Sequence, residues 1–178
     1  MASRRANVVL VCEDKLHEVF ARRFAKKQFG DRAHIVPRPA PPGVGDAAKW
    51  VRDQFVHELG RLPANTALVA LTDDDGQGRR ALIQRACQAA QLGWPRDKPV
   101  LLLVPGKALT YWLAYLRDDQ NVEAEPRAGQ SYDTVRDAAD VLATMCDANQ
   151  LREPAPPSLT EACEDYQRFR EAWNALMS

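Results

Sequence analysis

Four short apolar runs constrain the fold of this chain more than any other feature. They are rich in Val, Leu and Ile and cover residues 8–12, 34–36, 67–72 and 100–104. The first, third and fourth show no alternation of apolar and polar residues, which indicates strands that are buried on both faces. Strands are buried in this way in a parallel sheet covered by helices on both sides. The sequence therefore predicts an α/β fold with a parallel four-stranded sheet.

Between these runs, apolar residues recur at helical spacing. The stripes begin at Leu16, Trp50 and Leu82, and Asp46 is expected to cap the second helix. Strands and helices that alternate with short connections predict right-handed crossovers, as in a Rossmann-like sheet flanked by helices. The proline-rich segment 37–43 predicts a long mobile loop after the second strand.

Further helices are expected beyond the last strand, over residues 108–116 and 132–146. A last helix is predicted to open with a capping box formed by Ser158 and Glu161. An aromatic stripe in that helix either packs on the domain or helps to dock a partner.

Charge divides the chain into two parts. Residues 1–117 contain 19 Lys and Arg against 11 Asp and Glu, a net charge of +8, whereas residues 118–178 have a net charge of −8. We predict an α/β domain over 1–117 and an acidic helical extension over 118–178, packed on the domain or docking a partner. An acidic surface repels nucleic acid and suits a basic protein partner.

Composition and cysteine spacing indicate a globular protein of a reducing compartment. Apolar residues make up 46% and charged residues 27% of the chain, and no apolar run approaches the roughly 20 residues of a membrane span. Cys12, Cys87, Cys146 and Cys163 form no C-x-x-C pair, so we expect four reduced, mostly buried thiols. The apolar run 8–12 is too short for a signal peptide, and we predict a cytoplasmic location.

Carboxylates follow two of the predicted strands. Glu13 comes directly after the first run, and Asp73 and Asp75 come after the third. If these strands are neighbours, their carboxyl ends meet at one edge of the sheet, where α/β proteins bind ligands. Carboxylates so close repel one another unless cations or protons lie between them, and hard oxygen ligands suit Mg²⁺ or Mn²⁺. Removing one of these carboxylates is then expected to leave the stability of the fold unchanged or to raise it. A solvated turn is the alternative interpretation of residues 73–76.

Other polar residues are candidates for the same edge. His17 lies one helical turn after Glu13 and is a candidate ligand or proton carrier, or else a surface residue. Arg79, Arg80 and Lys107 follow the third and fourth strands, where they either bind phosphate or form solvated helix ends.

Two motifs carry a resemblance to a known family. The segment Val-Leu-Val-Cys-Glu13-Asp14 and the segment Leu-Val-Ala-Leu-Thr-Asp73-Asp74-Asp75-Gly76 resemble the two acidic motifs of the Toprim family, in the same order and over roughly residues 6–117. A stand-alone Toprim protein is similar to the nuclease branch, including nucleases of the OLD (overcoming lysogenization defect) type, which often work with an ATPase in phage defence. Asp14 and Thr110 depart from the family pattern, because many relatives have glycine and an acid at these positions.

The resemblance implies an Mg²⁺- or Mn²⁺-dependent endonuclease that acts on DNA or RNA and works with an ABC-type ATPase as its partner. Glu13 would be a metal ligand or general base, and Asp73 and Asp75 metal ligands. The alternative is a catalytically degenerate Toprim module that serves as the sensor or assembly subunit of a larger complex. Thr110 favours this alternative, and the carboxylates favour the enzyme. A small-molecule phosphotransfer domain is a third hypothesis.

Overall fold

The computed structural model describes residues 5–74, 76–117 and 130–178. Its centre is one parallel four-stranded sheet with the strand order β2-β1-β3-β4. The strands are β1 (Ala6–Cys12), β2 (Ala33–Pro39), β3 (Thr66–Leu71) and β4 (Val100–Leu103). The predicted α/β class and parallel four-stranded sheet are confirmed.

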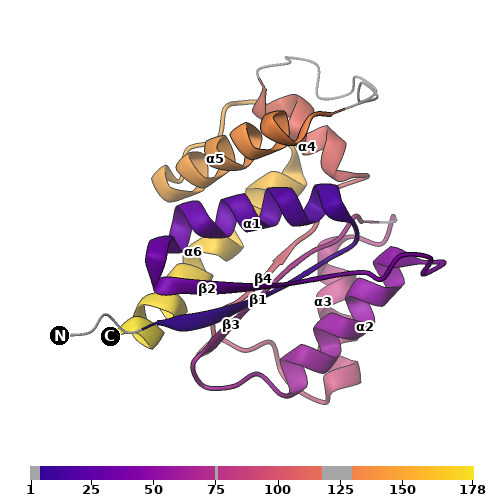
Figure 1. Cartoon of the computed structure of the whole chain (residues 1–178), viewed down its shortest axis with the longest axis vertical. Helices are drawn as coiled ribbons and strands as arrows, with labels where there is room; N and C mark the ends of the chain where they lie inside the picture. The colour runs from indigo at the N-terminus through magenta and orange to yellow at the C-terminus, as the bar shows by residue number, and fades with distance from the viewer. Residues whose placement is uncertain (1–4, 75, 118–129) are drawn as a thin grey trace.

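Helices cover both faces of this sheet (Figure 1). They are α1 (Lys15–Phe29), α2 (Ala47–Gly60), α3 (Arg79–Ala90), α4 (Leu109–Leu116), α5 (Tyr132–Ala148) and α6 (Pro157–Met177), with a short 3₁₀ turn at Gly30–Arg32. None of the helices in the described parts of the chain is long and apolar enough to cross a membrane.

Two hydrophobic cores lie on opposite faces of the sheet. In β1, Val8 and Leu10 belong to the core shared with α1, α4, α5 and α6, whereas Val9 and Val11 belong to the core shared with α2 and α3. Successive side chains of a strand point to opposite faces, so a strand buried on both sides must be apolar at every position. This explains the continuous apolar runs of the sequence.

The strand order creates a switch point between β1 and β3. The chain leaves β1 for β2 on one side of the sheet, and leaves β3 for β4 on the other. At such a point the two crossover connections separate and leave a crevice at the carboxyl ends of the strands. Residues that directly follow β1 and β3 therefore lie at the position where α/β proteins bind ligands.

The proline-rich segment differs from the prediction, because β2 continues through Pro37 to Pro39. The N–H of Ala40 donates to the carbonyl of Cys12, so N–H groups at alternate positions before it also face β1. Pro37 and Pro39 take the intervening positions, which point away from the sheet, and neither has an N–H to lose. A loop therefore begins only at Ala40.

Helices α5 and α6 belong to the same core as the sheet. Leu142 of α5 and Tyr166, Phe169 and Trp173 of α6 are buried in the cluster that includes Leu10 of β1. The division at residue 117 stays a prediction, but the described part of the C-terminal segment contributes to the core.

The expectation of four reduced cysteines is wrong for two of them. Cys146 of α5 and Cys163 of α6 form a disulfide, with their Cα atoms 4.8 Å apart, while Cys12 and Cys87 are free thiols. The two residues are 17 positions apart and show no motif, and only the packing of α5 against α6 brings them together.

Candidate metal centre at the carboxyl edge of the sheet

Glu13 is fixed to the end of the neighbouring strand. It is the first residue after β1, and its Oε1 accepts hydrogen bonds from the Thr72 hydroxyl (2.7 Å) and from the Asp73 N–H (2.6 Å). β1 and β3 pair in parallel up to Cys12 and Leu71, so the following residues of both strands leave the sheet side by side. The adjacency that the sequence analysis assumed is therefore present, and the Glu13 carboxylate spans the two strand ends.

Asp73 is the acceptor at the centre of the site. Its Oδ1 accepts the Leu109 N–H at 2.8 Å and lies 3.1 Å from Nε2 of His17. Leu109 is the first residue of α4, so the carboxylate also lies at the positive end of that helix. The exposed fraction of the Asp73 side chain is 21%, so part of the carboxylate remains accessible.

His17 lies between two carboxylates and is buried, with 5% of its side chain exposed. Its Nδ1 is 2.8 Å from Oδ1 of Asp14, and the same Asp14 oxygen accepts the His17 N–H at 2.9 Å as the N-cap of α1. Burial alone would lower the pKa of His17, but hydrogen bonds to Asp14 and Asp73 outweigh burial and raise the pKa to about 10. The hydrogen bond from His17 in turn lowers the pKa of Asp14 to about 2.

In this arrangement His17 is an imidazolium that donates to both carboxylates. The sequence suggested either a site residue or a surface residue, and the structure places His17 in the site. Sequence reasoning missed Asp14 as its partner. The available signal was the spacing, since an aspartate at an N-cap lies three residues before a side chain in the first turn.

Glu13, His17 and Asp73 each offer a ligand atom, and these atoms all lie within 4.8 Å of one another. Asp75, the remaining predicted ligand, lies outside the described residues. Two carboxylates and one imidazole are a donor set suited to Mn²⁺, and the carboxylates alone suit Mg²⁺. Each carboxylate has about four lone-pair positions, so the existing hydrogen bonds leave acceptor capacity. The donor set therefore fits a divalent cation, provided that His17 releases its proton.

The three predicted phosphate-binding residues do not behave alike. Arg80 and Lys107 are exposed, and both line a cavity of about 500 Å³ together with Asp74, the residue after Asp73. The Lys107 ammonium lies 4.9 Å from the centre of the Tyr111 ring, a cation–π contact. These two cations remain available to a phosphate beside the carboxylates.

Arg79 also borders this cavity, but its guanidinium is engaged elsewhere. It forms an ion pair with the buried Asp165 of α6, and its Nε donates to the carbonyl of Leu102 at 3.0 Å. A phosphate would have to compete with both contacts, so we assign Arg79 a structural role.

Helix α6 holds the loop that carries Lys107, a contact that sequence reasoning missed. Ser158 Oγ accepts hydrogen bonds from the Gly106 N–H and from Nε1 of Trp112, both at 3.0 Å. The predicted capping box is wrong, because α6 begins at Pro157 and Ser158 turns to this loop instead. Proline suits the first helical position because its missing N–H needs no partner there.

Comparison with protein-family models, with curated proteins and with solved structures finds no match to this chain. The functional assignment therefore depends on the residues of the site and on the motifs that contain them.

Proposed function

We propose that this protein is a metal-dependent nuclease of the Toprim type that hydrolyses phosphodiester bonds at the carboxyl edge of its sheet. The observation that carries the proposal is the convergence of Glu13, His17 and Asp73 at the switch point between β1 and β3. The cavity lined by Arg80 and Lys107 adjoins Asp74 and so lies beside them. Metal ligands next to exposed cations are what a site for a phosphodiester requires.

The side chains have distinct tasks in this proposal. Glu13 and Asp73 hold Mg²⁺ or Mn²⁺ through carboxylate oxygens, together with Asp75, and Glu13 is also a candidate general base. A divalent cation at this position supplies positive charge that stabilises the charge developing on the phosphate. Arg80 and Lys107 bind phosphate oxygens and hold the scissile group near the carboxylates.

His17 connects metal binding to proton movement. In the metal-free site its imidazolium neutralises Asp14 and Asp73. Release of the proton makes Nε2 a ligand or an acceptor for a proton from water, and Asp14 keeps the ring oriented through Nδ1. Asp14 thus has a role here that the glycine of many Toprim nucleases does not have.

The same contacts favour a second candidate function, a catalytically degenerate Toprim module in a sensor or assembly subunit. A protonated His17 supplies the positive charge that a metal would bring, so the acidic edge is stable without an ion. Thr110, in the first turn of α4, offers no carboxylate where relatives have an acid. A module of this kind needs neither metal nor substrate to fold.

The biological setting follows from the resemblance alone. We propose DNA or RNA as the substrate, an ABC-type ATPase as the partner and phage defence in the cytoplasm as the context. No described contact bears on these three points, and a genetic neighbourhood that contains such an ATPase would support them.

Metal binding and cleavage on matched variants test the proposal. Mn²⁺ binding is measured by calorimetry and electron paramagnetic resonance at pH 8, and cleavage on single- and double-stranded DNA and RNA. We expect wild type to bind Mn²⁺ and to cleave, and Asp73→Asn to lose both. Asp133→Asn removes an exposed carboxylate on α5 and should behave as wild type.

The outcomes separate the two candidates. Mn²⁺ binding without cleavage of any substrate, alone or with a partner, favours the degenerate module. No Mn²⁺ binding by folded wild type rejects the metal centre altogether. Cleavage that persists undiminished in Asp73→Asn rejects the assigned mechanism.

A further inference from the structure

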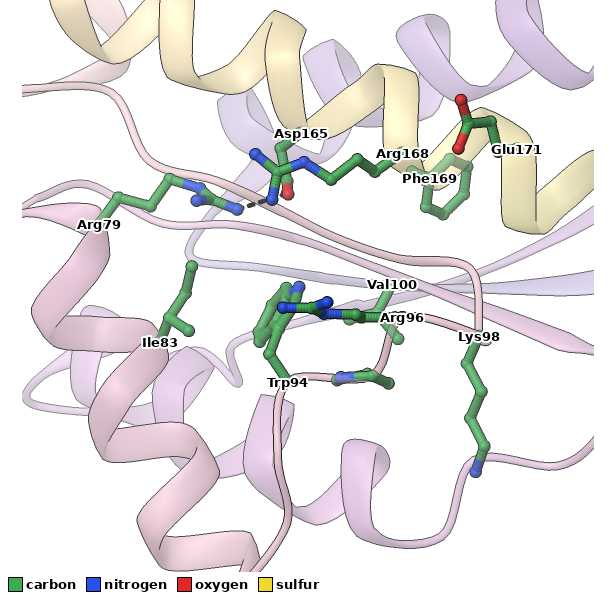
Figure 2. A pocket seen from close by; sticks show the side chains of 11 residues that line it. Arg79, Ile83, Trp94, Arg96, Lys98, Val100, Asp165, Arg168, Phe169 and Glu171 are labelled. Atoms are coloured by element: carbon green, nitrogen blue, oxygen red, sulfur yellow. Dashed lines mark ion pairs between the residues drawn. The ribbon is translucent and has the colours of Figure 1, made fainter.

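A second cavity lies away from the carboxyl edge, beside the outer strand β4 (Figure 2). Its volume is about 510 Å³, within the range of small-molecule sites. It is lined by α3, by the loop 94–98, by Val100 and by residues 165–171 of α6. Val100 is the first residue of β4, so the cavity faces the amino end of the strand, whereas Glu13 and Asp73 follow carboxyl ends.

Arginines from three different elements line this cavity. Arg79 comes from the start of α3, Arg96 from the loop before β4 and Arg168 from α6. Figure 2 shows Arg79 reaching from α3 towards Asp165, with Arg168 on the same side and Arg96 beside Trp94 across the cavity. Residues this far apart in sequence line one space only because α6 packs along β4.

The charges of the cavity do not balance. Asp165 is buried and pairs with Arg79. Burial raises the pKa of the Asp165 carboxyl, although the positive charges of Arg79 and Arg168 oppose that rise. Within the described parts of the chain, no carboxylate pairs with Arg96. The cavity lining thus carries four positive charges, from three arginines and Lys98, against two carboxylates, those of Asp165 and Glu171. Figure 2 shows Glu171 at the end of the cavity away from Arg79. An excess of positive charge in a concave site attracts anions.

One wall of the cavity is aromatic. Trp94 is half-buried and stacks on Phe55, with ring centroids 6.0 Å apart and an interplanar angle of 25°. Arg79 lies 6.0 Å from the Trp94 ring centroid. The indole is therefore held between the core and the cavity. The part of the indole that lines the cavity offers apolar contact to a ring in a ligand.

From these observations we propose that the cavity binds a nucleotide, with Arg96 and Arg168 on its phosphates and Trp94 beside its base. Guanidinium groups match phosphate oxygens in pairs, and their planar fork is better suited to this task than an ammonium. A volume of about 510 Å³ exceeds what a lone phosphate fills and accommodates a base and sugar as well. The Arg79–Asp165 pair forms the floor and stays intact.

This site is independent of the proposed metal chemistry. Arg79 borders both cavities, and it begins the helix that follows the loop of Asp73. A bound nucleotide therefore lies against Arg79, the first residue of α3, in a cavity that neither Glu13 nor Asp73 lines. The site is regulatory or accessory in position rather than part of the hydrolytic edge.

Calorimetric titration of the full chain with ADP tests the proposal, with EDTA present and at low ionic strength. We expect saturable binding of ADP, and weaker binding of pyrophosphate, which lacks the base. Arg96→Ala and Arg168→Ala should each weaken ADP binding about tenfold, the loss expected for one charge-assisted contact. Both side chains are exposed, so the melting temperature should change by less than about 2 °C.

Two control variants make the test specific. Arg170→Ala removes the same charge from the same helix, at a residue that contacts Tyr166 rather than the cavity, and should leave ADP affinity within about twofold. Lys107→Ala removes a cation from the cavity at the carboxyl edge and should also have no effect. Absence of saturable ADP binding overturns the proposal. The proposal is also overturned if Arg170→Ala weakens ADP binding as much as Arg168→Ala does, or if Lys107→Ala alone weakens ADP binding. Because EDTA removes divalent ions, a failure of metal-dependent cleavage leaves this result unaffected.

Discussion

Replacing His17 by glutamine should lower stability in a way that depends on pH. The imidazolium donates to Asp14 and Asp73, and its pKa is raised from 6.5 to about 10 in the folded protein. A group with a raised pKa stabilises the fold fully below its unfolded pKa. That contribution is lost as pH rises through the folded pKa, so the relevant window runs from about pH 6.5 to about pH 10.

The magnitude follows from the two pKa values. A rise from 6.5 to about 10 corresponds to about 5 kcal/mol at about 1.36 kcal/mol per pKa unit. Asp14 is more than half exposed, and solvent screening weakens its share of the interaction. We therefore expect about 3 kcal/mol of pH-dependent stabilisation, with Asp73 as the better shielded partner.

Urea unfolding followed by circular dichroism at pH 6, 8 and 10, with EDTA present, provides the measurement. The difference in free energy of unfolding between wild type and His17→Gln should be largest at pH 6 and shrink towards pH 10. His57→Gln, at an exposed position in the last turn of α2, should show a small difference at every pH. A wild-type advantage that stays constant or grows with pH would refute the protonated bridge.

Three further outcomes follow from the same contacts. Binding of Mn²⁺ should release about one proton, because His17 must lose its proton to become a ligand. Calorimetry in buffers of different ionisation enthalpy measures the number of protons released, and a value of zero would contradict a role for His17 as a ligand. The sequence predicted that removing a carboxylate leaves stability unchanged or raises it, but Asp73 accepts hydrogen bonds that the fold would lose. Asp73→Ala should therefore lower the free energy of unfolding by about 2 kcal/mol in urea titrations, whereas an unchanged value would favour electrostatic strain. Ser158→Ala should cost about 1 to 2 kcal/mol, because the Gly106 N–H and Trp112 Nε1 lose their acceptor. Ser158→Thr keeps that hydroxyl and serves as its control, and equal melting temperatures for both variants would contradict the role.

The sheet and its edge were predictable because they depend on local patterns. Continuous apolar runs identified the strands, and the position of Glu13 and Asp73 directly after two of them identified the edge. Neighbouring strands in a parallel sheet end together, so no side-chain detail was needed to bring these residues near each other.

Contacts that depend on side-chain direction or on distant helices were not predictable in this way. Arg79 was expected at a phosphate because it follows β3, yet a partner 86 positions later, Asp165, takes its guanidinium. Ser158 has the sequence of a helix cap, but Gly106 and Trp112 are better partners once α6 lies across their loop. The local sequence pattern indicates which kinds of partner a residue can bind, and the packing of α6 decides which of these partners is within reach.

The two outer strands of the sheet restrict how another protein can attach to it. On β2, Pro37 and Pro39 take outward positions and offer no N–H to an added strand. On β4, the carbonyl of Leu102 accepts a hydrogen bond from Nε of Arg79, whose guanidinium also pairs with Asp165. The ion pair takes the place of a neighbouring strand at that residue. β-Augmentation is thus hindered at these residues of both borders by different means, which favours helices and loops as the surface for a partner such as an ATPase.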